Sequence, residues 1–176
     1  MDRLCIEPIT RVNEADAKVI NGTFTINSRL LLSVLSDNFH YEVISIPAYD
    51  KGYSQVQIDP KITECNLKHS GHCGFLAYFQ NQPAGLILIS EGWNRMAVID
   101  DIRVDIAYRR QDIATSLLEQ AETWAYQRNL RGLRLETQDT NVAACQLYKH
   151  CGFVLSGFDR CLYAAIPENS HEIALF

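Results

Sequence analysis

Residues 73–128 limit the fold most strongly, because three strand-like runs follow one another closely and an amphipathic helix comes soon after them. The apolar runs cover residues 73–79, 84–90 and 96–104. A short turn with Asn81 and Pro83 separates the first two runs, which predicts a hairpin. From residue 113 to 128 the apolar residues recur every three or four positions, as on one face of a helix. This segment therefore predicts a sheet with a helix packed on it.

Further elements are expected on both sides of this segment. Upstream, we expect a short element at 3–9, a helix at 26–37, a strand at 41–46 and a long polar loop at 47–72. Downstream, we expect strands at 133–138, 152–158 and 161–166 and a helix at 141–150. Successive strands followed by alternating strands and helices predict an α/β (α+β) fold, with a mixed sheet and helices on its faces. Since no linker-like stretch divides the chain, residues 1–176 are expected to form a single domain.

The bulk composition favours some partners over others. The net charge is −5, from 21 acidic and 16 basic residues. Proteins that bind nucleic acid usually carry a basic excess, so we expect no nucleic acid as a partner. An acidic surface suits a small cationic substrate, although mild acidity also serves solubility alone. The start MDRLCIEPIT lacks a signal-peptide pattern and no apolar run is long enough to span a bilayer. We therefore expect a cytoplasmic protein with no membrane partner.

One cluster in the polar stretch has metal-ligand chemistry. Cys65, His69, His72 and Cys73 place four soft ligands close together in the sequence. Their spacing matches no usual zinc finger or ribbon, and Cys73 opens an apolar run. We therefore expect a loop that leads into a strand, and no metal site.

A strand, a turn and a helix meet between residues 104 and 118. The first amides of a helix have no partners inside the helix and face the positive end of its dipole, so such a junction favours phosphate. Arg109 and Arg110 add positive charge beside it, and Thr115 adds a hydroxyl. Because basic residues before a helix are common, this pattern needs a second signal before it indicates a function.

The second signal is the spacing Asn141-x-x-Ala144-x-x-Leu147-Tyr148, followed by Gly152-Phe153. Together with the turn at 109–115, it resembles the signature of N-acetyltransferases of the GNAT superfamily. That family binds the pyrophosphate of acetyl-CoA in an Arg/Gln-x-x-Gly-x-Gly/Ala loop and places an Asn-x-x-Ala-x-x-Leu-Tyr helix beside the thioester. The resemblance covers residues 96–155 and implies a GNAT-like, mostly antiparallel sheet. It implies acetyl-CoA as co-substrate, held by Arg109, Arg110, Gln111, Asp112, Ile113, Ala114, Thr115, Asn141, Ala144 and Tyr148.

Within that superfamily the chain looks most like the streptothricin acetyltransferases. The residues that carry this closer resemblance are Pro47–Tyr53, Trp93-Asn94, Ile99-Asp100, Gly132–Gln138, Ala144-Cys145, Cys151–Phe153 and Leu162-Tyr163. The resemblance implies acetyl transfer to an amine of the β-lysine part of the antibiotic, which confers resistance, and makes a homodimer plausible. That family usually continues beyond the ending HEIALF, so we expect a short final strand at one edge of the sheet.

The loop departs from the family pattern at two positions. Asp112 stands where the pattern has its middle glycine, and Arg110 stands where a glycine often follows the arginine. Glycine suits such positions because the backbone approaches phosphate closely and adopts unusual dihedral angles. Either Asp112 points outward as a helix N-cap or first-turn acid and leaves its amide free, or its charge weakens cofactor binding. We favour the first interpretation because Asp tolerates turn conformations.

The resemblance also implies roles for two further elements. Main-chain groups of Ile102, Arg103 and Val104 would hold the pantetheine arm, and an amide of the same strand can stabilise the carbonyl oxygen. Tyr148 would protonate the departing thiolate, unless it packs on the inner face of its helix. Asn141 would contact the cofactor, and helix capping explains it equally well.

The substrate side has several candidates. Carboxylates that accept the proton of an amine or hold its cation are Asp100, Asp101 and Glu136, with Asp100 and Glu136 on strands expected to be neighbours. Along the strand, we expect Asp100 to share a face with Ile102, and Asp101 with Ile99 and Arg103. A salt bridge is the competing explanation for each carboxylate, for instance Asp101 with Arg103. Aromatic walls for a cation are predicted from Tyr49, Tyr53 and Trp93, although Trp93 fits a core position equally well.

Three functions remain open on these residues. The first is acetylation of a streptothricin-type antibiotic. The second is the same chemistry on another amine, such as a polyamine, an amino acid or a protein N-terminus. The third is a degenerate domain that binds acyl-CoA, or nothing, and serves as a sensor.

Overall fold

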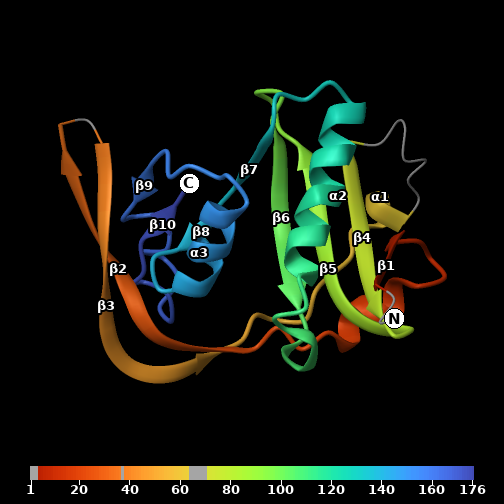
Figure 1. Cartoon of the computed structure of the whole chain (residues 1–176), viewed down its shortest axis with the longest axis horizontal. Helices are drawn as coiled ribbons and strands as arrows, with labels where there is room; N and C mark the ends of the chain where they lie inside the picture. The colour runs from red at the N-terminus through yellow and green to blue at the C-terminus, as the bar shows by residue number, and fades with distance from the viewer. Residues whose placement is uncertain (1–3, 37, 64–70) are drawn as a thin grey trace. The chain divides into compact units, whose positions relative to one another are not determined.

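The computed structural model describes residues 4–36, 38–63 and 71–176 of the chain. These residues fall into two compact units (Figure 1). The first unit comprises residues 1–23 and 52–135, and the second comprises residues 24–51 and 136–176. Each unit carries part of the residues that the sequence marks as functional, and each is described in turn.

The first unit is built on a five-stranded sheet, shown in Figure 1. Its order is β1 (Leu4–Pro8), β4 (His72–Phe79), β5 (Gln82–Glu91), β6 (Ala97–Val104) and β7 (Leu133–Leu135). All neighbours are antiparallel except β6 and β7, which run parallel. The expected hairpin is confirmed, and its two turn residues Gln80 and Asn81 have φ of 51° and 62°. Such positive φ angles are those of the tight turn that matches the twist of paired strands.

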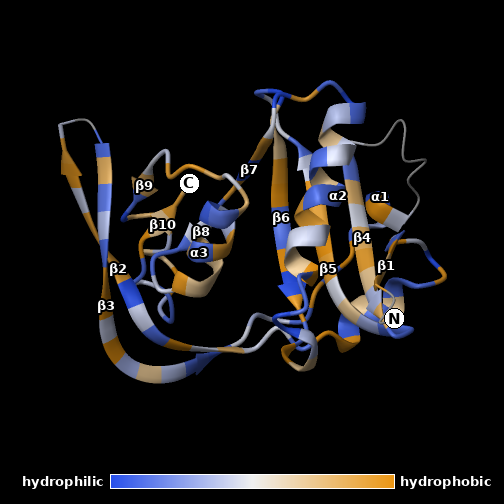
Figure 2. Cartoon of the chain, viewed as in Figure 1, coloured by the Kyte–Doolittle hydropathy of each residue, from blue (hydrophilic) through white to orange (hydrophobic). Residues whose placement is uncertain are grey.

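Apolar residues predominate at successive positions of β4 and β5 (Figure 2), so side chains on both faces of this part of the sheet are apolar and mostly buried. Helix α2 (Ile113–Gln127) packs on one face, and its predicted position is confirmed. Its buried side chains are Ile113, Leu117, Leu118, Ala121, Trp124 and Ala125. On the other face lie the short helices η1 (Glu14–Val19) and α1 (Pro60–Thr63). Their core joins Ile9, Ala17, Ile20, Val56, Ile62, Leu76, Leu86 and Leu88.

The parallel pairing of β6 with β7 is short. It begins at Ala97 opposite Leu133 and ends at Ile99 opposite Leu135, although β6 continues to Val104. The predicted single strand at 133–138 is therefore two strands, because β8 (Thr137–Gln138) belongs to a different sheet in the second unit. Within the described part of the first unit, the far end of β6 has no strand on this edge.

A bulge at Asp100 changes which side chains of β6 share a face. Opposite β5, Asp101 pairs with Leu88 but Ile99 pairs with Ile89, so Asp100 is the extra residue. Directly opposite residues share a face, and Leu88 and Ile89 are on opposite faces, so Asp101 and Ile99 are on opposite faces too. The prediction that Asp101 shares a face with Ile99 is thus wrong, because simple alternation takes no account of a bulge.

The second unit combines a long hairpin with a small sheet and a helix (Figure 1). The hairpin consists of β2 (Phe24–Leu35) and β3 (Asn38–Lys51), which are antiparallel. The small sheet has the order β8, β10 (Ala174–Leu175) and β9 (Phe158–Asp159). The predicted helix at 141–150 is confirmed as α3 (Val142–His150). The final strand β10 is short as expected, but it lies in the middle of its sheet and not at an edge.

The predicted helix at 26–37 is wrong, since residues 26–35 belong to β2. The run contains apolar residues at three- and four-residue steps, but the periodicity of a short apolar run does not by itself separate a helix from a strand. Its pairing with β3 along almost its whole length decides the structure. The predicted strand at 41–46 is confirmed as part of β3.

Two further predictions are corrected by hydrogen-bond pairing. The expected loop at 47–72 starts too early, because β3 continues through Pro47 to Lys51. The β2–β3 register shifts next to Pro47, so the missing N–H of proline is tolerated there. Of the strands expected at 152–158 and 161–166, Phe158–Asp159 alone is paired. Residues 162–165 form turns instead, with Ala164 N donating to Cys161 O and Ile166 N to Tyr163 O.

Gly85 allows α2 to approach the sheet and is a test of this packing. A Cβ atom at Gly85 would lie 2.8 Å from the carbonyl oxygen of Arg103 and 3.1 Å from a methyl of Ile113. We expect Gly85→Ala to lower the free energy of unfolding by about 1–3 kcal/mol, because backbone must move to admit the methyl group. Denaturant unfolding followed by circular dichroism measures the change. Gly157→Ala is the matched control, since nothing lies within 4 Å of its Cβ position; equal stability of the two variants would contradict this packing.

Candidate active site

The turn before α2 replaces glycines with residues that adopt glycine-like backbone angles. Helix η2 (Ile106–Tyr108) follows β6, and its cap Asp105 accepts a hydrogen bond from the Ala107 amide. After it, Arg110 has φ of 60° and Asp112 has φ of 56°, ψ of 15°. Both angles lie in the left-handed region that usually favours glycine. The two departures from the loop pattern therefore keep the backbone shape that the pattern implies.

Three amides at the start of α2 lie ahead of the helical hydrogen-bond ladder. The first bond of helical spacing runs from Ser116 N to Asp112 O at 3.0 Å, so the amides of 113–115 have no carbonyl inside the helix. They lie at the positive end of the helix dipole, which suits a phosphate. Asp112 is the N-cap residue, as we favoured, but its side chain makes no capping hydrogen bond and is exposed.

Arg109 holds the turn rather than presenting a free charge. Its Nη2 donates to the carbonyl of Thr23 at 2.6 Å, and its Nε to that of Val104 at 3.4 Å. Burial of the guanidinium lowers the pKa of Arg109 from its ordinary value. Arg110 and Gln111 are exposed in the same turn. Arg110 is therefore the cation with the freer side chain beside the helix start.

The free edge of β6 presents the peptide groups of two residues. Asp105 N donates to Ala84 O on the β5 side at 2.9 Å. Because peptide groups alternate in direction along a strand, those of Ile102 and Val104 point to the edge beyond the β7 pairing, and those of Arg103 point to β5. Of the three predicted residues, Ile102 and Val104 are thus the ones that can pair with an extended ligand such as pantetheine.

The carboxylates of β6 differ in what they contact. Asp101 forms an ion pair with Arg103 at 2.7 Å, so the predicted salt bridge is present. The Arg103 side chain also donates to Ser54 O at 2.8 Å and lies 5.7 Å from the ring centre of Tyr53. Asp100, at the bulge, accepts a 2.9 Å hydrogen bond from Ser90 Oγ, and partial burial raises the pKa of its carboxyl.

Trp93 lies in the turn between β5 and β6 with 95% of its surface exposed, so the core alternative is wrong. A role in binding the substrate stays a prediction. Of the candidate metal ligands, Cys73 is buried in β4 and His72 begins that strand, whereas Cys65 and His69 lie outside the described residues. Within the ranges that the structure describes, no group of three or more His, Cys, Asp or Glu side chains is placed to hold a metal ion.

Helix α3 in the second unit carries the remaining cofactor candidates. Asn141 caps it, since its side chain accepts a 3.3 Å hydrogen bond from the Ala144 amide. Tyr148 is partly buried, with its ring centre 5.7 Å from that of Phe153. Phe153 N in turn donates to Tyr148 O at 2.9 Å, which fixes the chain after the helix. The capping interpretation of Asn141 is therefore confirmed, and its contact with the cofactor stays a prediction.

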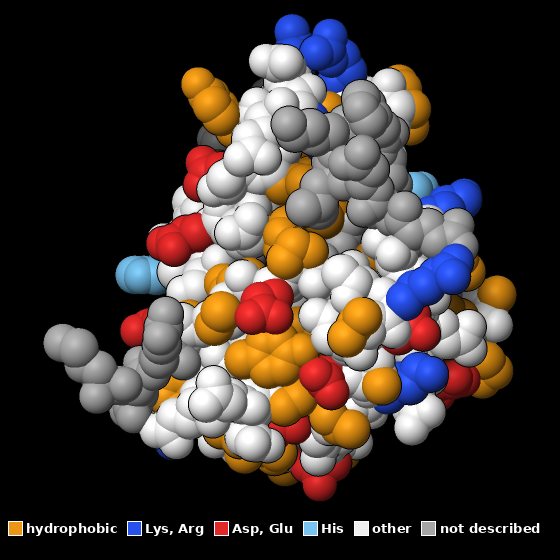
Figure 3. Space-filling view, turned by 90° about the vertical axis from the view of Figure 1, so that its right-hand side faces the viewer, with side chains coloured by type: hydrophobic (Ala, Val, Ile, Leu, Met, Phe, Trp, Pro, Cys, Tyr) orange, Lys and Arg blue, Asp and Glu red, His pale blue; other side chains and the backbone are white. Residues whose placement is uncertain are grey.

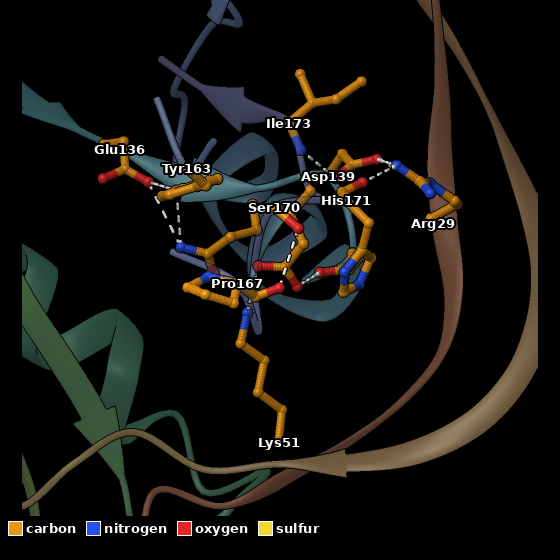
Figure 4. A network of polar contacts seen from close by, with 12 residues as sticks. Arg29, Lys51, Glu136, Asp139, Tyr163, Pro167, Ser170, His171 and Ile173 are labelled. Carbon is orange, nitrogen blue, oxygen red and sulfur yellow. Dashed lines mark hydrogen bonds and ion pairs between the residues drawn. The ribbon is translucent and has the colours of Figure 1, made fainter. Parts of the chain in front are cut away.

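Glu136 follows β7 and falls in the second unit, where two neutral side chains contact it. The Tyr163 hydroxyl donates to Glu136 Oε1, and Gln138 Nε2 contacts the same oxygen at 3.5 Å (Figure 4). Partial burial raises the pKa of Glu136, and the Lys51 charge and the Gln138 hydrogen bond lower it. Sequence reasoning missed Tyr163 as a site residue; the signal that was available is its place in the Leu162-Tyr163 match to the resembling family.

Two ion pairs with buried carboxylates belong to the polar network of the second unit (Figure 4). Lys51 Nζ contacts Glu172 Oε2 at 2.5 Å, and Thr140 Oγ1 donates to Glu172 Oε1 at 2.6 Å. Asp139, fully buried, forms an ion pair with Arg29 and accepts from Ile173 N at 2.8 Å.

Tyr49 belongs to this second unit, at the edge of the same network. Burial and the charge of Glu172 raise its pKa, and a hydrogen bond with Thr140 opposes the shift. The three aromatic residues predicted to line the substrate site therefore belong to different units, because Tyr53 and Trp93 lie in the first unit. Asp100 and Glu136 likewise belong to different units, so the cleft that they are predicted to share stays a prediction.

Comparison with known proteins identifies the family. Residues 38–153 match the model of the acetyltransferase (GNAT) family. The chain belongs to this family. It is 34% identical to streptothricin acetyltransferase A of Bacillus subtilis (strain 168) over 173 residues, covering 97% of this chain and 96% of that protein. It is 36% identical to a streptothricin acetyltransferase of Escherichia coli over 143 residues, 81% of this chain and 77% of that protein.

A solved structure agrees with the sequence relatives. A Bacillus anthracis (strain Ames) protein, assigned as a streptothricin acetyltransferase and bound to acetyl coenzyme A, is 33% identical and has a TM-score of 0.87. The likeness covers 98% of this chain and 94% of that one. The predicted family, fold and N-acetyltransferase activity are thus confirmed. No helix among the described residues is long and apolar enough to cross a membrane.

Acetyl-CoA is the co-substrate of this family, and the first unit fits it. The amides of 113–115 and the exposed Arg110 suit the pyrophosphate, and the edge of β6 suits the amides of the pantetheine arm. The Asp112 side chain is exposed and makes no capping hydrogen bond, yet a carboxylate this near the helix start also opposes an anion, so the two interpretations of Asp112 do not exclude each other.

Replacement of Asp112 tests this turn. We expect Asp112→Asn to lower KM for acetyl-CoA about two- to fivefold, the range for one exposed charge near a helix end. Asp112→Gly should lower it at least as much, because it also removes the Cβ from a left-handed residue. Steady-state kinetics with varied acetyl-CoA gives both values. A rise of KM in both variants would show that the carboxylate supports binding, contrary to this account.

Proposed function

We propose that this acetyltransferase transfers the acetyl group of acetyl-CoA to an amine of a streptothricin-type antibiotic, at its β-lysine portion, and so inactivates it. The observation that carries the proposal is the 34% identity to the B. subtilis streptothricin acetyltransferase along 97% of the chain. The net charge of −5 suits a polycationic substrate. In the view of Figure 3, acidic side chains lie among apolar ones, and Lys and Arg side chains lie at the top and right. A cytoplasmic location goes with this proposal, because the reaction draws on cellular acetyl-CoA.

In the proposed reaction the first unit holds the donor. The amides at 113–115 bind the pyrophosphate, and the peptide groups of Ile102 and Val104 pair with the pantetheine arm. In the proposed complex the thioester lies along β6, and an amide at the edge of this strand stabilises the negative charge that develops on the carbonyl oxygen. Arg109 supports this step by fixing the turn through the Thr23 carbonyl.

The chemical step needs one proton removed and one supplied. The neutral amine nitrogen attacks the carbonyl carbon, the C–S bond breaks, and the amine gives up a proton. We assign the proton that the departing thiolate takes to the hydroxyl of Tyr148. The structure places Tyr148 partly buried on α3 and supported by Phe153, which limits the conformations of its ring.

We assign the carboxylate that receives the amine to Glu136. Of the three carboxylates in the polar network of the second unit, Asp139 is paired with Arg29 and Glu172 with Lys51. Glu136 is contacted by neutral donors instead and keeps its negative charge for a cationic substrate. Asp100 is the second candidate, since its partner Ser90 is also neutral, whereas Asp101 is neutralised by Arg103.

A degenerate, non-catalytic domain is disfavoured by the turn itself, because Arg110 and Asp112 hold the left-handed angles that the missing glycines would supply. Acetylation of another amine remains as an outcome of the test. Homodimer formation likewise stays a prediction.

Thiol release from acetyl-CoA separates these functions. With streptothricin present, we expect release at a rate well above that with acetyl-CoA alone, and mass spectrometry should show one acetyl group on the β-lysine portion. Equal release with spermidine, free lysine and a peptide N-terminus would replace the antibiotic by a broader amine substrate. No release with any amine, and no heat of acetyl-CoA binding, would overturn the enzymatic proposal.

Tyr148→Phe tests the acid. We expect kcat to fall about a hundredfold or more while KM for acetyl-CoA stays within about twofold, because the hydroxyl acts at the leaving thiolate. The exposed Tyr126, which is 82% accessible on α2, provides the matched control Tyr126→Phe, with unchanged kinetics expected. A Tyr148→Phe enzyme as fast as wild type would refute the assignment.

A further inference from the structure

Three side chains around Glu136 form a hydrogen-bond chain with a defined direction. Gln138 Nε2 donates to the Tyr163 hydroxyl at 2.9 Å, and that hydroxyl donates to Glu136 Oε1. Because the amide supplies a proton to the Tyr163 oxygen, the single hydroxyl proton of Tyr163 is directed at the carboxylate. Figure 4 shows the Tyr163 side chain reaching Glu136 from the C-terminal segment.

Both contacts fall on one carboxylate oxygen. Tyr163 donates to Oε1, and the longer contact from Gln138 reaches the same atom. The lone pairs of Oε2 are thereby left for an incoming N–H donor. Lys51, the cation whose charge acts on Glu136, contacts Glu172 directly at 2.5 Å. Glu136 is therefore oriented by neutral groups without losing its charge to an ion pair.

Tyr163 is the one buried side chain in an exposed segment near the C-terminus. Residues 160–168 are exposed with the exception of Tyr163, which is 7% accessible. Its neighbour Leu162 is exposed, although it is the more apolar residue. Two successive turns, closed by Ala164 N to Cys161 O and Ile166 N to Tyr163 O, hold the segment in shape. The buried Tyr163 has partners for its hydroxyl in Gln138 and Glu136, as buried tyrosines usually do.

We propose that Tyr163 is a positioning residue for substrate recognition: it orients the Glu136 carboxylate so that Oε2 faces the ammonium group of the substrate, with Gln138 setting the direction of its hydroxyl. This inference rests on the proposed role of Glu136 toward a cationic amine. It adds a specificity element from the C-terminal segment, which lies beyond the 38–153 region that the family model matches.

Loss of the Tyr163 hydroxyl should weaken binding of the amine substrate and leave binding of acetyl-CoA unchanged. In Tyr163→Phe the ring still fills its place, but the carboxylate loses a hydrogen bond that favours its ionised form, so the pKa of Glu136 rises further. The carboxylate must be ionised to hold a cation. The acidic limb of kcat/KM for streptothricin therefore moves to higher pH, and activity is lost earlier as pH falls. At neutral pH we expect KM for streptothricin to rise about tenfold, with KM for acetyl-CoA unchanged.

The decisive experiment compares Tyr163→Phe, Glu136→Gln and the double variant in kinetics across pH, with Tyr126→Phe as control. The account predicts that Tyr163→Phe adds no further loss once Glu136 is Gln, because Tyr163 acts through that carboxylate. Independent losses that multiply in the double variant, or an unshifted acidic limb, would overturn it.

A substrate-free measurement separates this inference from the proposed function. The 13C carboxyl signal of Glu136, identified by its absence in Glu136→Gln, should titrate at higher pH in Tyr163→Phe than in wild type. An unchanged titration overturns the inference whether or not streptothricin is a substrate, and failure of streptothricin turnover with a shifted titration overturns the substrate alone. If Tyr163→Phe does not fold, Gln138→Leu takes its place, with a smaller shift in the same direction expected and no shift contradicting the chain.

Discussion

The early end of the β6–β7 pairing is the constraint on which the proposed donor site depends. Three residue pairs join the strands, and beyond Ile99 no strand among the described residues of the first unit lies opposite this edge of β6. Unpaired peptide groups in a folded protein need partners, so such an edge accepts a ligand that mimics a strand. The bulge at Asp100 then decides which residues face the edge, and it selects Ile102 and Val104. Gly85 completes the arrangement, since it lets α2 begin close to the end of the same strand.

Charge is distributed differently in the two units. At the start of α2, the free amides and the exposed Arg110 suit the anionic donor of the proposed reaction, whereas Arg109 donates hydrogen bonds to backbone carbonyls of the turn. In the second unit, two buried carboxylates are matched by cations and Glu136 is left with neutral partners. For the proposed role of Glu136 this difference matters, because a cation paired with Glu136 would remove its attraction for a cationic amine.

Sequence reasoning predicted the parts that local patterns determine. The hairpin of β4 and β5, helix α2 and the capped helix α3 follow from apolar periodicity and turn residues. Sequence reasoning failed where pairing between segments determines the secondary structure. The leucines of β2 have a helix-like spacing, but the segment forms a strand that pairs with β3. The bulge at Asp100 leaves no mark that a single sequence reveals, whereas the left-handed angle of Asp112 was indicated by the glycine that the family pattern has at this position. Tyr163 was missed as a site residue because its partner Glu136 is distant in sequence and its own segment resembles a strand.

Amide hydrogen exchange with and without acetyl-CoA tests the central claim most directly, since it reports on individual peptide groups. The account predicts slowed exchange on binding at Ile102 and Val104, and at residues 113–115, while Arg103, whose N–H points to β5, changes little. Binding of acetyl-CoA that leaves the amides of Ile102, Val104 and residues 113–115 unprotected would contradict a donor site formed by the open edge of β6 and the start of α2.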